Sequence, residues 1–114
     1  MAGSFLKKTT DAMQRGLSRA VVALRERMRW GQMDLATELT KQGARAKIAM
    51  TPTQGTISRW EHGEQAPSAP HRMALARVAA KYGHEDLAEV FRAPVSAWRL
   101  VGRVKLGLRI QEDE

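Results

Sequence analysis

The sequence predicts an all-α fold, with five short helices in one compact domain, a helical N-terminal extension and a short C-terminal tail. Apolar residues recur at intervals of three and four along most of the chain, which places their side chains on one face of a helix. Glycine and proline separate these segments at positions where helices end or restart. A chain of 114 residues fits one such domain, and a further sensor or catalytic domain would not fit beside it.

The first helix of the domain is predicted from Leu17, Val21, Leu24 and Met28, which follow one another at spacings of four, three and four. It begins near residue 17, or earlier near residue 10, and residues 1–16 form a basic extension. The domain itself is expected over residues 17–93. A second helix is predicted to begin at Gln32, directly after a glycine.

The third helix has the clearest start signal and is predicted over residues 51–61. Thr51 can cap it, Pro52 suits the first helical position, and Gln54 completes a Thr-x-x-Gln capping box. Gly63 follows the helix and can take the left-handed backbone conformation that ends many helices.

Two more helices complete the predicted domain. A proline-rich restart at residues 67–70 leads into a fourth helix, which reaches residue 81 or 82 and ends at Gly83. A fifth helix is predicted over Glu85 to Arg92, because acidic residues in its first turn suit the helix dipole. Pro94 closes it.

The positive charge of the chain is unevenly distributed. The net charge is +7; residues 1–59 contain eleven Lys and Arg against four Asp and Glu, whereas residues 60–114 contain eight of each. A localised basic excess suits a polyanion, which leaves DNA, RNA and an acidic membrane surface open as partners. RNA ranks low because no stacking aromatic residues accompany the basic ones.

Other function classes have little support in the sequence. There are no cysteines, the three histidines are too scattered for a metal site, and no catalytic grouping of residues is present. We therefore expect no enzyme, no metal, no cofactor and no small-molecule ligand. The chain shows no transmembrane segment and no secretory signal, which favours a cytoplasmic protein.

One motif is specific. Leu24-Arg25-Glu26 precedes Gln32, and residues 53–63 read Thr-Gln-Gly-Thr-Ile-Ser-Arg-Trp-Glu-His-Gly, followed by Pro67. Over about residues 17–92 the chain resembles the lambda-repressor/Cro-like (XRE) helix-turn-helix family. The resemblance implies a sequence-specific regulator of transcription that binds double-stranded DNA, with helix 51–61 in the major groove. It further implies a repressor, a two-fold homodimer on a palindromic site, and association with the nucleoid when bound.

The candidate DNA-binding residues lie on this helix and around the one before it. Gln54 can pair with adenine N6 and N7, or serve only as a capping residue, and Arg59 can contact guanine or a phosphate. The resemblance assigns a phosphate contact to Gln32. Gly55 lets the backbone approach the DNA closely. The full set is Gln32, Arg45, Lys47, Thr53, Gln54, Gly55, Thr56, Ser58 and Arg59.

A second set of residues has a structural role. Ile57 and Trp60 are three apart on one helix face, which predicts that they hold the third helix against the core. The resemblance implies an ion pair between Arg25 and Glu61 that joins the first and third helices. The set comprises Arg25, Leu35, Ala36, Ile57, Trp60, Glu61 and Gly63.

The chain departs from the family pattern between the second and third helices. Residues 41–50 form a basic connector without a clear period, where the family has a short turn. Either the second helix is extended or a basic loop is inserted. Arg45 and Lys47 would then contact the phosphate backbone, or the loop is simply tolerated.

The tail, residues 94–114, is the second departure. Its apolar residues fit a helix or a strand, and they complete the monomer core or form a dimer interface; we favour dimerisation. The candidate dimer residues are Trp98, Leu100, Val101, Val104 and Leu106. The alternative function is a protein-interaction module of helix-turn-helix type, an antitoxin or coactivator bridge, that binds a protein partner through this tail.

Overall fold

The computed structural model describes residues 2–94, with side chains from residue 12 onward. All the secondary structure in this part of the chain is helical and it contains no strand, so the all-α prediction is confirmed. The helices are α1 (Ala2–Met28), α2 (Gln32–Arg45), α3 (Gln54–Glu61), α4 (Ala69–Lys81) and α5 (Glu85–Arg92).

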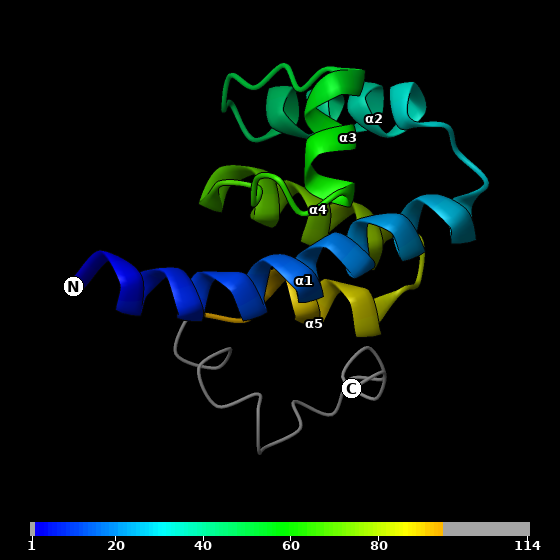
Figure 1. Ribbon diagram of the computed structural model, residues 1–114. Coiled ribbons are helices and arrows are strands. Elements are labelled where there is room, and N and C mark those ends of the chain that lie inside the picture. The colour runs from blue at the N-terminus through cyan, green and yellow to red at the C-terminus, as the bar shows by residue number, and fades with distance from the viewer. Residues whose placement is uncertain (1, 95–114) are drawn as a thin grey trace.

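The helices form a bundle in which α3 lies between α2 and α1 (Figure 1). The long helix α1 packs against both α3 and α5, while α4 packs against α2 and α5. In Figure 1, α3 stands almost upright, with α2 at its upper end and α1 below it. The most N-terminal turns of α1 extend beyond the bundle.

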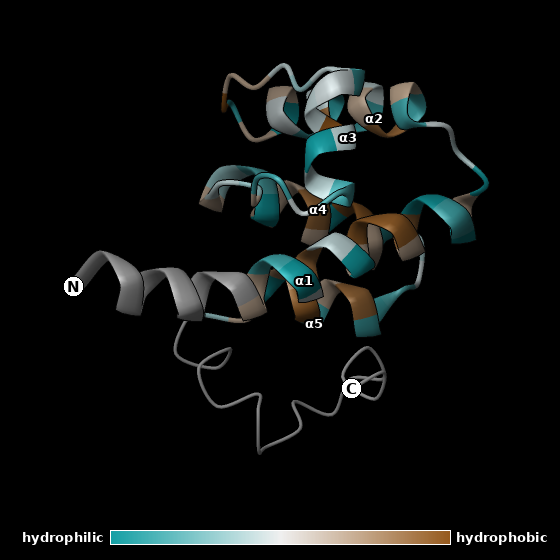
Figure 2. Cartoon of the chain, in the orientation of Figure 1, coloured by the Kyte–Doolittle hydropathy of each residue, from teal (hydrophilic) through white to brown (hydrophobic). Residues whose placement is uncertain are grey.

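A single apolar core holds the helices together. Figure 2 shows the hydrophobic segments of α1, α4 and α5 on the sides where these helices meet. Burying a side chain as large as these contributes about 1.5–3 kcal/mol. The largest side chains that are fully buried are Leu17, Val21, Leu24, Leu35, Leu39, Ile57, Trp60, Leu75, Val78, Leu87 and Phe91.

Two predicted helix starts were wrong. Helix α1 begins at Ala2, because Gly16 does not interrupt the helix and Met13 is already buried in the core. Helix α3 begins at Gln54, three residues later than predicted. Its cap is Thr53, whose hydroxyl accepts a hydrogen bond from the backbone N–H of Thr56 at 3.2 Å and whose own N–H donates one to Thr56 Oγ1 at 3.2 Å.

The reason for the later start of α3 lies in Pro52. Its ring is buried, so it packs the connector against the domain instead of beginning the helix. The Gln54 side chain points toward α2 and hydrogen-bonds Gln32 rather than returning to Thr51. The capping box therefore exists, but it is Thr53 and Thr56 that form it.

Four of the helices end in the same way. After each of α1, α2, α3 and α4, one residue takes a left-handed backbone, and two backbone hydrogen bonds close the end in the pattern of a Schellman motif. The left-handed residues are Arg29, Lys47, Gly63 and Gly83, with φ of 59°, 60°, 73° and 83°. Glycine adopts this conformation without steric cost, whereas for arginine and lysine the β-carbon makes it costly.

Lys47→Gly is expected to raise the free energy of unfolding by about 0.5–1 kcal/mol, because glycine removes the steric cost of the left-handed conformation. Urea denaturation of the two proteins measures this difference. Lys47→Ala is the matched control, since it removes the same charge and keeps the β-carbon. Equal stability of the glycine and alanine variants would contradict the assignment.

Candidate nucleic-acid interface

Helix α3 has one buried face and one exposed face. Ile57 and Trp60 are buried with 0% and 1% exposure, so this face holds the helix to the core. Gln54, Gly55 and Arg59 are exposed. The exposed face therefore carries three of the candidate DNA-binding residues at the surface, and Thr56 and Ser58 lie half-buried beside them; capping Thr53 is exposed too.

The ion pair between Arg25 and Glu61 is present and has two hydrogen bonds. Arg25 donates from Nε to Oε2 at 2.6 Å and from Nη2 to Oε1 at 3.2 Å. The exposed fraction of the side chain is 7% for Glu61 and 23% for Arg25, so the pair is partly shielded from water. The hydrogen bond to Glu61 raises the pKa of Arg25 above its usual value. Ser18 adds a third link, because its hydroxyl donates to the backbone carbonyl of Glu61 at 2.6 Å.

A chain of hydrogen bonds extends from this ion pair to the exposed start of α3. Glu61 Oε1 accepts a hydrogen bond from Gln32 Nε2 at 3.0 Å. Gln32 Oε1 in turn accepts one from Gln54 Nε2 at 3.4 Å. The first side chain of α2 and the first side chain of α3 are thereby oriented by a buried carboxylate. We call this series Arg25–Glu61–Gln32–Gln54 the polar chain.

Gly55 has no packing role within the domain. A β-carbon built at this position would lie 3.6 Å from Arg59 Nη1 and 3.6 Å from Thr53 Oγ1, which are ordinary contacts. Glycine inside a helix costs about 1 kcal/mol relative to alanine. No contact in the described part of the chain requires a glycine at this position.

Arg59 is held by a neighbour but keeps free donors. Its Nε donates to Gln65 Oε1 at 3.1 Å, in the segment that follows the helix. One of the five N–H donors of the guanidinium is thereby used, and the residue is exposed, so the other four can reach a ligand. Ser58 Oγ lies 3.4 Å from His62 Nδ1. The arginine is oriented and still able to bind a ligand.

The connector combines an extended helix with an ordered loop. Helix α2 runs to Arg45, five residues into the predicted connector of residues 41–50, and Lys47 then takes a left-handed backbone that ends it. Met50 and Pro52 are buried, which holds the loop against the domain. Arg45 and Lys47 are both exposed. Extension of the helix, one of the two predicted alternatives, is therefore what the structure shows for residues 41–45.

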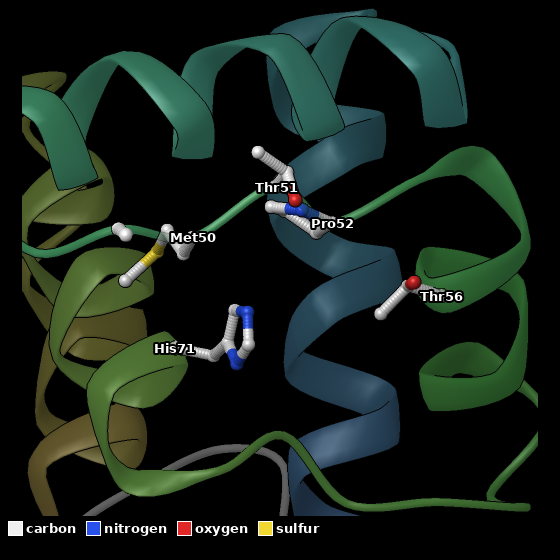
Figure 3. A pocket seen from close by; sticks show the side chains of 6 residues that line it. Met50, Thr51, Pro52, Thr56 and His71 are labelled. Carbon is white, nitrogen blue, oxygen red and sulfur yellow. The ribbon is translucent and has the colours of Figure 1, made fainter.

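A hollow of about 350 Å³ lies between the connector and helices α3 and α4 (Figure 3). His71 of α4 and Thr56 of α3 face it from opposite sides, below Thr51 and Pro52. The His71 ring lies edge-on to Trp60, with 5.1 Å between ring centres. Burial lowers the pKa of His71, which favours the neutral form of the ring.

Arg29 is a basic residue that sequence reasoning did not single out. It is exposed, it has a left-handed backbone, and it lies three residues before Gln32. Together with Lys47 it places a cation beyond each end of α2. A left-handed arginine is uncommon, but its conformation cannot be deduced from the sequence, because the common signal for this position is glycine.

The described part of the chain offers neither a metal site nor a membrane span. No group of three or more His, Asp or Glu side chains there could hold a metal ion. Within residues 2–94, none of the helices combines the length and the apolar character needed to cross a lipid bilayer. The candidate dimer residues Trp98, Leu100, Val101, Val104 and Leu106 lie outside the described residues.

Comparison with known proteins gave no match to any family model, to any curated protein or to any solved structure. The site consists of the exposed face of α3, the polar chain beneath it, and cations beyond both ends of α2.

Proposed function

We propose that this chain is a sequence-specific regulator of transcription that binds double-stranded DNA with α3 in the major groove. The observation that carries the proposal is the polar chain, which orients the exposed Gln54 amide from a buried ion pair. A side chain that only capped the helix would need no such support. Pre-oriented groups lose less conformational entropy on binding, which is the property expected of a side chain that contacts bases.

The exposed face of α3 offers donors and acceptors suited to base edges. Gln54 can present its amide to adenine, where N6 donates and N7 accepts. Gly55 has no side chain, so the α3 backbone can approach the base pairs next to it. Arg59 keeps donors free for guanine or for a phosphate.

Phosphate contacts would flank this face. Gly31 has no side chain with which to cap α2, and Asp34 accepts only the N–H of Gly31 itself, at 2.8 Å. The N–H groups of the first turn of α2 are then available to a phosphate oxygen. Arg29 and Lys47, beyond the two ends of α2, supply the positive charge for neighbouring phosphates.

The family resemblance supports a more specific proposal. We infer a lambda-repressor/Cro-like protein that acts in the cytoplasm as a repressor by occlusion, and that binds as a two-fold dimer on a palindromic site. The Arg25–Glu61 ion pair joins α1 and α3, the helices that the resemblance joins. This supports the likeness without depending on the tail.

The test is selection from a random pool of double-stranded DNA, carried out with the full chain and with Gln54→Ala plus Arg59→Ala. The full chain is expected to enrich one defined sequence, palindromic if it binds as a dimer, and the double variant is expected to lose that preference. Gln14→Ala plus Arg15→Ala on α1 is the matched control and should enrich the same sequence. Failure of a folded wild-type chain to enrich any sequence would refute the proposal.

The dependence of DNA affinity on salt concentration is an independent test. Each phosphate contact contributes about 0.9 to the slope of log affinity against log salt concentration. Arg29→Ala and Lys47→Ala are each expected to reduce the slope by about one such contact and to leave the sequence preference unchanged. A slope near zero for the wild-type chain would point to a protein partner instead.

A further inference from the structure

A second surface lies away from the exposed face of α3. A groove of about 140 Å³ runs between the C-terminal half of α2, the start of the connector and α4. Its lining residues are Gln42, Gly43, Ala46, Ile48, Met50, Pro70, Met73, Ala74 and Arg77. The walls are largely aliphatic, and we refer to this surface as the α2–α4 groove.

The groove exposes apolar side chains that the core does not use. Among residues 12–94, only four large hydrophobic side chains are exposed, and two of them, Ile48 at 41% and Met73 at 47%, line this groove. The other two are Met33 and Tyr82, which lie outside it. The two side chains form a small exposed apolar patch at a concave surface, and burial of such a patch by a partner is favourable.

The groove also contains an amide that forms no hydrogen bond within the described part of the domain. Gln42 is 7% exposed overall, and no hydrogen bond joins its amide to another described residue. The amide is not among the buried side-chain atoms that lack a partner, so it is open to solvent or to a ligand. An amide offers both N–H donors and a carbonyl acceptor, which matches the backbone of a bound peptide.

The lining of the groove contains one charged residue. Arg77 is exposed, and it has no ion pair with another residue in the range 12–94. The groove thus combines apolar walls, one amide open to a ligand and one cation.

We propose that the α2–α4 groove binds an extended peptide segment of a partner protein. The segment inserts one branched or aromatic apolar side chain between Ile48 and Met73, and its backbone pairs with the amide of Gln42. An acidic residue next to the apolar one pairs with Arg77. This interaction is separate from the exposed face of α3, and it stands whether or not that face binds DNA.

The test is selection of peptides from a random dodecamer library displayed on phage, with the full chain as target. Enriched peptides are expected to carry Asp or Glu within two positions of a large apolar residue. Met73→Glu is expected to weaken binding of the enriched peptides at least about tenfold, because it places a charge where the apolar side chain inserts. Arg77→Glu is expected to weaken the acidic peptides in the same way.

The matched control is Met33→Glu, which makes the same change at an exposed methionine outside the groove and should leave peptide binding unaltered. Absence of enriched peptides, or enriched peptides that Met73→Glu binds as well as wild type, would overturn the proposal. A wild-type dimer that Met73→Glu converts to monomers would identify a second copy of the chain as the occupant and overturn it as well. Enriched peptides without acidic residues would refute the role of Arg77.

Discussion

Glu61→Ala is expected to lower the free energy of unfolding by about 3 kcal/mol, because it leaves Arg25 without its buried counter-charge. The glutamate side chain is 7% exposed and accepts two hydrogen bonds from Arg25 and one from Gln32. Removal also frees Gln54 from its fixed orientation, so the proposed function predicts that DNA affinity falls together with stability. Urea denaturation followed by circular dichroism measures the first effect.

The control for Glu61→Ala removes both charges at once. In Arg25→Met plus Glu61→Leu no buried charge is left unpaired, so the loss should be smaller than the sum of the losses for the two single variants. Arg25→Lys keeps the charge and loses the paired hydrogen bonds to the carboxylate. Its free energy of unfolding should lie between that of the wild type and that of Arg25→Met alone. Additive losses in the double variant would show that the two side chains do not act as a pair.

Gly43→Ala is expected to lower the free energy of unfolding by about 1–3 kcal/mol, the usual cost of forcing an extra carbon into a packed site. A β-carbon at Gly43 would lie 2.6 Å from Met50 Cγ and 2.7 Å from the carbonyl oxygen of Ile48. The methionine can move, but the carbonyl belongs to the backbone that closes α2. The hydrogen bond of 2.8 Å from Ile48 N to Gly43 O fixes this approach.

The matched control is Gly55→Ala, the same change at a helical glycine whose surroundings leave ordinary space for a β-carbon. That variant is expected to gain stability by up to about 1 kcal/mol, because alanine favours helix. Thermal unfolding monitored by circular dichroism compares the two. A neutral Gly43→Ala would mean that the connector can shift without cost.

Most of the fold follows from apolar spacing and from glycine. The sequence predicted the core face of α1 because Leu17, Val21 and Leu24 recur at helical intervals, and all three are fully buried. It also predicted the ends at Gly63 and Gly83, since glycine is the residue that takes the left-handed conformation freely. Local preference and tertiary packing agree at these positions.

The errors arose where packing outweighed local preference. Thr51 and Pro52 form a good start signal, but burial of the proline ring removed that residue from the helix. Arg29 and Lys47 take a conformation for which the sequence gives no signal. Gln42 lies on a helix at a position whose burial only the arrangement of α2 and α4 decides. The α2–α4 groove therefore could not be predicted from the sequence.

The ion pair was predicted by resemblance, while its continuation was not. Spacing cannot reveal that Gln32 and Gln54, twenty-two residues apart, lie within hydrogen-bond distance. That contact depends on the path of the connector, which residues 46–53 determine through Met50 and Pro52. Contacts of this kind need the relative position of two helices, which the local pattern does not contain.

Because α3 is short, its exposed face depends on the folding of the whole domain. Eight residues are too few to form a stable helix alone in water, since isolated helices shorter than about 12–15 residues are marginal. The exposed face of α3 therefore exists only while the whole domain is folded. A partly unfolded or proteolysed chain would retain none of that surface. Inside a cell, the amount of protein that presents the surface would therefore follow the folded fraction. Core substitutions far from α3 would then act by lowering the concentration of folded protein.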